Sequence, residues 1–172
     1  MLTTPTYELT KSEKSFISLH LLFAFIALAI GTLFGPLQAF EFSGVDFYPY
    51  LEPIIQSYYQ GLTLHGVLNA LIFTTFFITG FLTLTTIYGL KRPLKYPVLN
   101  QVGFWTMVVG LVTAAVPILL NQASVLYTFY PPLKANGFFY LGLTLVVVGS
   151  WIEGYGFIFT WRDWRKENPG VR

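Results

Sequence analysis

His65 lies in the middle of an apolar run, QSYYQGLTLHGVLNALIF (residues 56–73), that contains no charged side chain. The whole chain has two histidines and no cysteine, so disulfides and thiolate metal sites within it are excluded. If the run crosses a membrane, a histidine there is rare and usually functional, and neutral imidazole is the commonest metal ligand among side chains. Two interpretations stay open: His65 ligates a metal, or it is hydrogen-bonded to a neighbouring helix.

The spacing around His65 favours a ligand of some size. At about 100° per residue, a helix places Tyr58, Leu62, His65 and Asn69 in one narrow stripe. Gly66, beside the histidine, removes a side chain from the same surface, which leaves clearance for a flat, bulky ligand. A single imidazole fills only one axial position of a haem iron. If His65 binds haem, the second ligand must therefore come from another chain, another copy or a segment absent here.

The composition predicts that these residues belong to an all-α membrane protein. Of 172 residues, 54% are hydrophobic and 10% charged, against about 25% charged in soluble domains. The net charge of +2 gives no reason to expect a nucleic-acid partner. Four apolar stretches reach the roughly 20 residues that a spanning helix needs; three are uncharged, and the fourth contains one charged residue, Glu153. The predicted spans cover approximately residues 16–40, 58–90, 98–120 and 138–161, between an N-terminal tail (1–15) and a basic C-terminal tail (162–172).

The distribution of basic residues predicts the orientation of this four-span region. Nine of the ten Lys and Arg residues fall on one side, and only Lys134 lies on the other. By the positive-inside rule, both termini are then cytoplasmic, and the basic tail meets anionic lipid. The apolar run after the N-terminal tail is longer than the apolar h-region of a signal peptide, which has about 7–15 residues, so we expect no cleavable signal.

The other polar residues inside the spans have plainer interpretations. We expect His20, near the cytoplasmic end of the first span, to be an interfacial side chain. Glu153, the one acid well inside a span, is interpreted as a protonated or hydrogen-bonded packing residue, with proton uptake as the alternative. Threonines of the second span either carry a water chain or bond their own helix backbone; these are Thr74, Thr75, Thr83, Thr85 and Thr86.

Small residues four apart indicate where helices approach each other closely. Gly31 and Gly35 have this spacing in the first span, and Ser150 and Gly154 have it in the fourth. Such pairs are typical of helix contacts in lipid. The sequence therefore predicts contacts at both positions.

Four segments in order carry a family resemblance: GTLFGPLQAF, SYYQGLTLHGVLNALIF, ASVLYTFYPPLK and WRDWRKENPG. Together they resemble the N-terminal part of subunit I of haem-copper oxidases, most closely the B-type, ba3-like cytochrome c oxidases. The resemblance covers nearly the whole chain. It implies that His65, in LTLHG, is an axial iron ligand of the low-spin haem, a haem b. It also implies that this haem is lined by Gly35, Gln38, Tyr58, Leu62, Asn69 and Tyr127, with Tyr130 as a less certain neighbour.

The resemblance further implies a larger assembly in a prokaryotic plasma membrane. The remaining helices of subunit I, in a bundle of about twelve or more, would hold the high-spin haem and CuB, because none of those histidine motifs occurs here. A copper-containing subunit II would pass electrons from cytochrome c. We therefore expect the 172-residue chain alone to be catalytically incomplete, and to contribute to oxygen reduction and proton pumping only within the whole enzyme.

Two alternatives remain open from the sequence. A nitric oxide reductase-like subunit shares the first haem histidine, and its iron site would lie in helices absent here. A non-catalytic protein is the other alternative, either a degenerate fragment or a small four-helix b-type cytochrome that pairs two His65 rings by dimerising.

Overall fold

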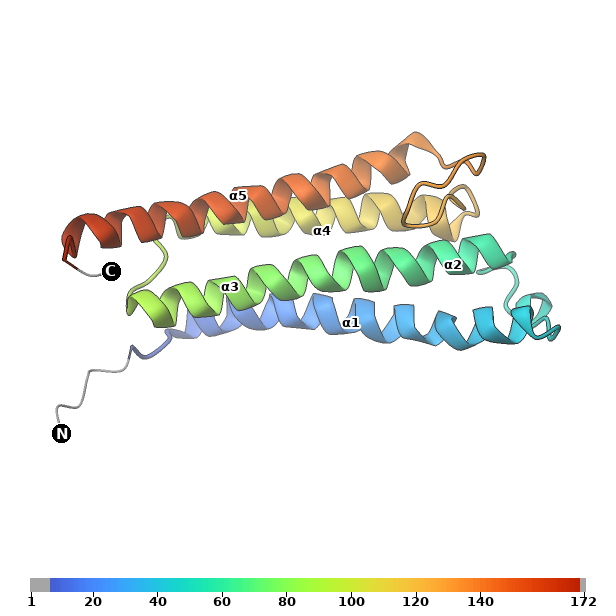
Figure 1. The fold of residues 1–172 in the computed structure, drawn as a ribbon, viewed down its shortest axis with the longest axis horizontal. Helices are drawn as coiled ribbons and strands as arrows, with labels where there is room; N and C mark the ends of the chain where they lie inside the picture. The colour runs from blue at the N-terminus through green and yellow to red at the C-terminus, as the bar shows by residue number, and fades with distance from the viewer. Residues whose placement is uncertain (1–6, 171–172) are drawn as a thin grey trace.

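A computed structural model describes residues 7–170 of the chain, and these residues are almost entirely helical (Figure 1). Within this part the only strand-like pairing is an isolated bridge between Ala123 and Ala135. The helical elements are α1 (Lys11–Phe42), the short 3-10 helix η1 (Tyr48–Tyr50), α2 (Tyr58–Gly66), the π-helical segment η2 (Val67–Phe73), α3 (Thr74–Leu90), α4 (Pro97–Leu119) and α5 (Gly137–Glu167).

Four helical rods are long and apolar enough to cross a membrane: α1, the continuous α2–η2–α3 rod, α4 and α5. The predicted all-α fold with four long apolar helices is therefore confirmed. The first and last helices extend beyond the predicted spans, α1 beginning at Lys11 and α5 ending at Glu167. A capping box explains the early start of α1: the Thr10 hydroxyl accepts from the Glu13 amide, and the Glu13 carboxylate accepts from the Thr10 amide.

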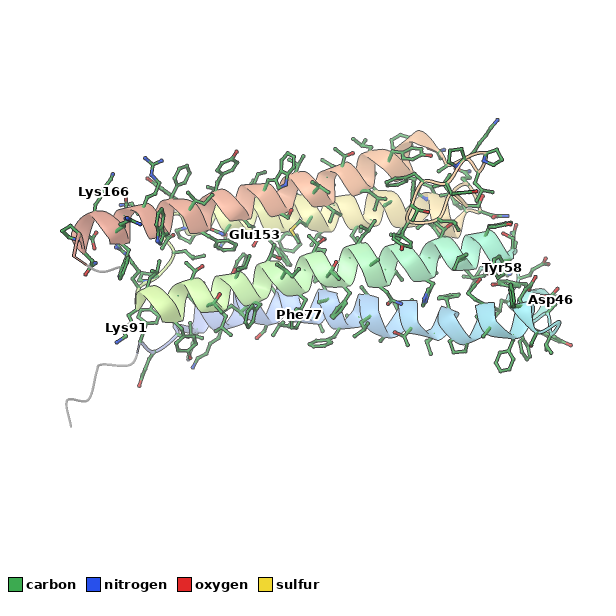
Figure 2. All side chains as sticks on the ribbon, in the orientation of Figure 1. Asp46, Tyr58, Phe77, Lys91, Glu153 and Lys166 are labelled. Carbon is green, nitrogen blue, oxygen red and sulfur yellow. The ribbon has the colours of Figure 1, made fainter. Side chains whose placement is uncertain are left out.

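The rods run antiparallel as two hairpins, α1 with α2–η2–α3 and α4 with α5 (Figure 1). The start of α1, the α3–α4 loop and the end of α5 meet at one end of the bundle, which we call the basic end. Figure 2 shows Lys91 and Lys166 there, and Asp46 and Tyr58 at the opposite end. The cytoplasmic location of the basic end stays a prediction.

The α4–α5 hairpin is held at close range by glycines. A Cβ on Gly142 would lie 2.6 Å from the Gly110 carbonyl oxygen, and one on Gly149 would lie 2.6 Å from that of Gly103. The predicted contact at Ser150 and Gly154 is wrong, because a Cβ on Gly154 would meet nothing within 4 Å. The four-residue spacing was present, but that face of α5 does not meet a helix of this chain.

Candidate functional site

His65 lies on α2 immediately before the helix widens. Ser57 begins α2 by accepting a hydrogen bond from the Gln60 amide through its side chain. After Gly66 the backbone continues as a π-helix over Val67–Phe73 before α3 resumes the ordinary period. Such π-helical turns within α-helices often occur at functional sites. The widening shifts the rotational register of the residues after His65 relative to those before it.

The His65 ring is oriented by the backbone of α1. Its Nδ1 lies 2.8 Å from the Gly31 carbonyl oxygen and 3.2 Å from the Asn69 side-chain nitrogen. A carbonyl oxygen only accepts, so Nδ1 carries the hydrogen and Nε2 keeps its lone pair. No hydrogen-bond partner of Nε2 occurs among residues 7–170, and the residue is only half-buried. Metal-ligating histidines have this arrangement, with one nitrogen fixed by an acceptor and the other free.

Two glycines of α1 give the ring its space. A Cβ on Gly35 would lie 3.2 Å from His65 Cε1, and a Cβ on Gly31 would lie 2.4 Å from Asn69 Oδ1. Any side chain at these positions would push α1 away from α2 or turn the imidazole. The Gly31–Gly35 pair is thus a helix contact, as its spacing predicts, and it also positions the candidate ligand.

The donor set fits a haem. It combines a nitrogen with a free lone pair, glycine clearance beside the ring, and two buried amide oxygens without partners, Asn69 Oδ1 and Gln38 Oε1. From this chain, a low-spin haem needs one of its two axial nitrogens and an apolar surface with few polar atoms. The residues near His65 supply both.

The other residues that the resemblance implies for the haem are distributed on both sides of α2. Gly35 and Asn69 contact His65 directly, as described above, and Tyr58 and Leu62 precede it on α2. The Gln38 amide donates to the Tyr48 hydroxyl at 2.8 Å, farther toward the end opposite the basic end. Tyr127 lies against Gly66, where a Cβ would be 2.5 Å from its Cδ1. Haem contact by these residues stays a prediction.

Tyr48 is a residue of this region that the sequence did not single out for its contacts. It lies in η1 and is buried. Burial is the main cause that raises the pKa of its phenol, with nearby Glu41 adding to the effect and the Gln38 hydrogen bond opposing it. An aspartate shortly before the YPY segment indicates a turn, and in the structure the Tyr48 amide donates to the Asp46 side chain. Nothing in the sequence indicates that the Tyr48 hydroxyl contacts Gln38 on α1.

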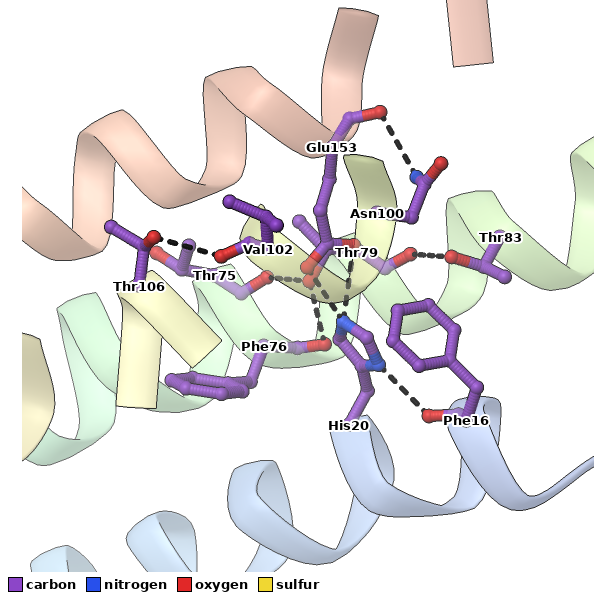
Figure 3. A network of polar contacts seen from close by, with 10 residues as sticks. All are labelled: Phe16, His20, Thr75, Phe76, Thr79, Thr83, Asn100, Val102, Thr106 and Glu153. Atoms are coloured by element: carbon purple, nitrogen blue, oxygen red, sulfur yellow. Dashed lines mark hydrogen bonds and ion pairs between the residues drawn. The ribbon is translucent and has the colours of Figure 1, made fainter. Parts of the chain in front are cut away.

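His20 and Glu153 form a second polar centre, near the basic end (Figure 3). Both side chains are fully buried, and His20 Nε2 lies 2.9 and 3.1 Å from the two Glu153 carboxylate oxygens. The prediction of an interfacial His20 is therefore wrong, whereas Glu153 is hydrogen-bonded as expected. Thr74, Thr83 and Thr85 donate to carbonyls of their own rod, the simpler of the two interpretations.

Two ion pairs connect the α3–α4 region to the end of α5. Lys95 lies 2.8 Å from Asp163, and Arg92 lies 2.8 Å from Glu167. The hydrogen bond that the Lys95 ammonium donates to the Asp163 carboxylate raises the pKa of Lys95 above its ordinary value. Exposed pairs of this kind contribute little stability, but they fix the loop beside the basic tail.

Comparisons with known proteins agree with this geometry. Residues 15–172 match the family model described as cytochrome c and quinol oxidase polypeptide I. The chain is 46% identical over 162 residues to cytochrome c oxidase subunit 1 of Thermus thermophilus, a match that covers 92% of this chain and 28% of the relative. It is also similar to a chain of a haem-copper terminal oxidase dimer determined by cryo-EM, with a TM-score of 0.86 and 37% identity. That match covers 95% of this chain and 28% of the other, so the chain spans little more than a quarter of either relative's length.

Proposed function

Because the chain belongs to the cytochrome c and quinol oxidase polypeptide I family, we propose that it forms the N-terminal, low-spin-haem part of subunit I of a respiratory terminal oxidase. In this proposal the donor is cytochrome c and the acceptor is oxygen, as the name of the Thermus relative suggests. That name also favours an oxidase over a nitric oxide reductase. The chain lies in a prokaryotic plasma membrane, with its basic end in the cytoplasm.

The observation that carries the proposal is the free Nε2 of His65. The ring is already fixed in the tautomer that an axial ligand needs, because Nδ1–H donates to the Gly31 carbonyl oxygen at 2.8 Å. Little side-chain ordering therefore remains when iron binds, and the carbonyl increases the basicity of the ligating nitrogen. When bound, the haem b supplies one-electron oxidation and reduction.

The neighbouring residues give the site its shape. Gly35 keeps the ring edge clear, and the Asn69 side chain lies against the ring from one turn along the helix. Gln38 presents a buried amide oxygen that no residue of 7–170 satisfies. Tyr58, Leu62 and Tyr127 complete the predicted lining; their role is to exclude water from the iron, which influences its potential.

The second axial ligand comes from outside these 172 residues. The chain has one other histidine, His20, and this residue is buried against Glu153 toward the opposite end of the bundle. We infer that further helices of subunit I supply the second imidazole, together with the high-spin haem and CuB. Subunit II, which carries copper, completes the electron path.

Reduced-minus-oxidised spectra of the assembled oxidase complex, purified from membranes, test this proposal. We expect a low-spin b-type signal that disappears in His65→Ala, because no other described residue offers an imidazole there. Tyr88→Phe, a change at an exposed tyrosine farther along the same rod, is the matched control and should leave the spectrum unchanged. A low-spin haem signal that persists at full intensity in His65→Ala would show that the ligand is another residue.

A further inference from the structure

His20 and Glu153 share a single proton. Nδ1 of His20 lies 2.9 Å from the Phe16 carbonyl oxygen, an acceptor only, so Nδ1 carries a hydrogen. The contact between Nε2 and the carboxylate, at 2.9 Å, then contains one further hydrogen. That hydrogen lies on nitrogen, giving imidazolium and carboxylate, or on oxygen, giving neutral imidazole and carboxylic acid. In both forms the pair has no net charge, which lowers the desolvation cost of burying it in an apolar bundle.

The surroundings of the pair are aromatic and uncharged. The rings of Phe16 and Phe104 each lie 4.6 Å from the His20 ring, centroid to centroid, and Phe76 lies 6.3 Å away. Neither α3 nor α4 places an acidic or basic side chain against the pair within the described residues. A hydrophobic contact would pack this interior at lower desolvation cost, so an ionisable pair here indicates a function.

A cavity opens at the basic end and extends toward this pair. It has a volume of about 230 Å³ and lies between the start of α1, the end of α3 and the start of α4. Its lining includes Glu13, Thr83 and Gln101. At about 30 Å³ per water molecule, it accommodates several waters. Phe16 and Thr83 line the cavity, and Phe16 also contacts His20, so one layer of side chains separates the cavity from the pair.

Asn100 provides an unsatisfied polar group beside Glu153. Its side-chain nitrogen donates to the Glu153 backbone carbonyl at 3.2 Å. Its Oδ1 is buried, and no residue of 7–170 donates to it. Buried amide oxygens are normally satisfied by a protein group or by ordered water. This oxygen faces Gly156 on α5, about one helical turn from Glu153.

We propose that His20 and Glu153 form a proton-exchange site that communicates with water at the basic end through this cavity. A proton enters from water near Glu13, crosses the layer of Phe16 and Thr83, and replaces the proton shared by Nε2 and the carboxylate, which leaves by the same route. No electron transfer and no other reactant is involved. The site is remote from His65 and does not depend on the proposed haem.

Infrared spectroscopy of the membrane-purified protein after transfer to D2O tests the site. Bands that disappear in Glu153→Gln or His20→Gln identify the pair. The carboxylic acid C=O band shifts on exchange when the proton lies on oxygen, and the imidazolium ring bands shift when it lies on nitrogen. We expect the band that reports the shared proton to shift with time in the natural protein. In Thr83→Leu, which fills the layer between cavity and pair, exchange should slow by about tenfold or more, equal to roughly 1.4 kcal/mol in the barrier.

Thr85→Leu is the matched control, because Thr85 is on the same helix but exposed; its exchange should equal that of the natural protein. If Thr83→Leu fails to fold, Ser12→Phe closes the cavity at an exposed position of its lining and should slow exchange in the same way. The proposal would be overturned if the band that reports the shared proton shows no isotope shift over hours. It would also be overturned if the cavity-filling variants leave the exchange rate unchanged.

Discussion

Replacing Gly31 by alanine tests whether close contact between α1 and α2 builds the His65 site. The new Cβ would lie 2.4 Å from Asn69 Oδ1 and 3.0 Å from Leu68 Cβ, whereas ordinary contacts begin at 3.4 Å. The Asn69 amide can rotate away, but it then loses its 3.2 Å contact with His65 Nδ1. The Leu68 Cβ cannot move without the backbone, so the helices must separate.

The cost of this substitution follows from two contributions. Overpacking costs about 1–3 kcal/mol, and alanine recovers up to about 1 kcal/mol over glycine in a helix. We expect a net loss of up to about 2 kcal/mol for Gly31→Ala. Gly154→Ala meets nothing within 4 Å and should instead gain up to about 1 kcal/mol, so the two variants should differ by roughly 1–3 kcal/mol.

Equilibrium unfolding in mixed micelles, followed by circular dichroism, measures this difference. Combining Gly31→Ala with Asn69→Ala removes the closest clash and should recover part of the loss in stability. A Gly31→Ala protein as stable as Gly154→Ala would show that α1 and α2 are not in close contact at His65.

Two further predictions concern the end of the bundle opposite the basic end. Gly66→Ala places a Cβ 2.5 Å from Tyr127 Cδ1, so it should displace that tyrosine and lower thermal stability, and Tyr127→Ala should restore much of the loss; equal melting of Gly66→Ala and the natural protein would contradict this. Tyr48→Phe removes the acceptor of the Gln38 amide and should destabilise the fold near neutral pH by about 1 kcal/mol. Because burial raises the pKa of Tyr48, its stabilisation is complete below the ordinary value of about 10 and is lost as the pH rises through the folded pKa. Unfolding measured across the alkaline range should therefore lose part of its pH dependence in Tyr48→Phe, and an unchanged profile would contradict the burial effect.

The sequence predicts the helices well because apolar length alone determines them. A stretch without charge, such as residues 58–90, has few alternatives to a spanning helix. The stripe through His65 and Asn69 was also predictable, since helical periodicity places them one turn apart. The contact of Asn69 with His65 in the structure agrees with that spacing.

The partners of the polar residues were not predictable in the same way. His20 and Glu153 are separated by 133 residues, and nothing local in either segment indicates the other. The group that orients His65 is a backbone carbonyl, that of Gly31, and residue type carries no information about it. The π-helical segment likewise changes the helical period, and no residue type in it indicates this change.

The glycine contacts were predicted correctly on α1 and incorrectly on α5. Small residues four apart identify a helix face without large side chains, but they do not indicate whether another helix packs against that face. The better signal on α5 is a seven-residue repeat, Gly142, Gly149 and Gly156, matched by Gly103 and Gly110 on α4. Residues seven apart are separated by about two helical turns, so the repeated glycines keep the same face of α5 toward α4 along its length. The isolated Ser150–Gly154 pair has no such repeat.

Chemical rescue of His65→Gly tests whether His65 is the axial haem ligand. This variant removes the imidazole but leaves Gly31, Gly35 and Asn69 to shape its space, so added imidazole should bind there. We expect that the low-spin haem spectrum of the assembled oxidase complex is lost in His65→Gly and returns with imidazole in a concentration-dependent manner. An unaltered low-spin spectrum in His65→Gly without imidazole would contradict the assignment of His65 as the axial ligand.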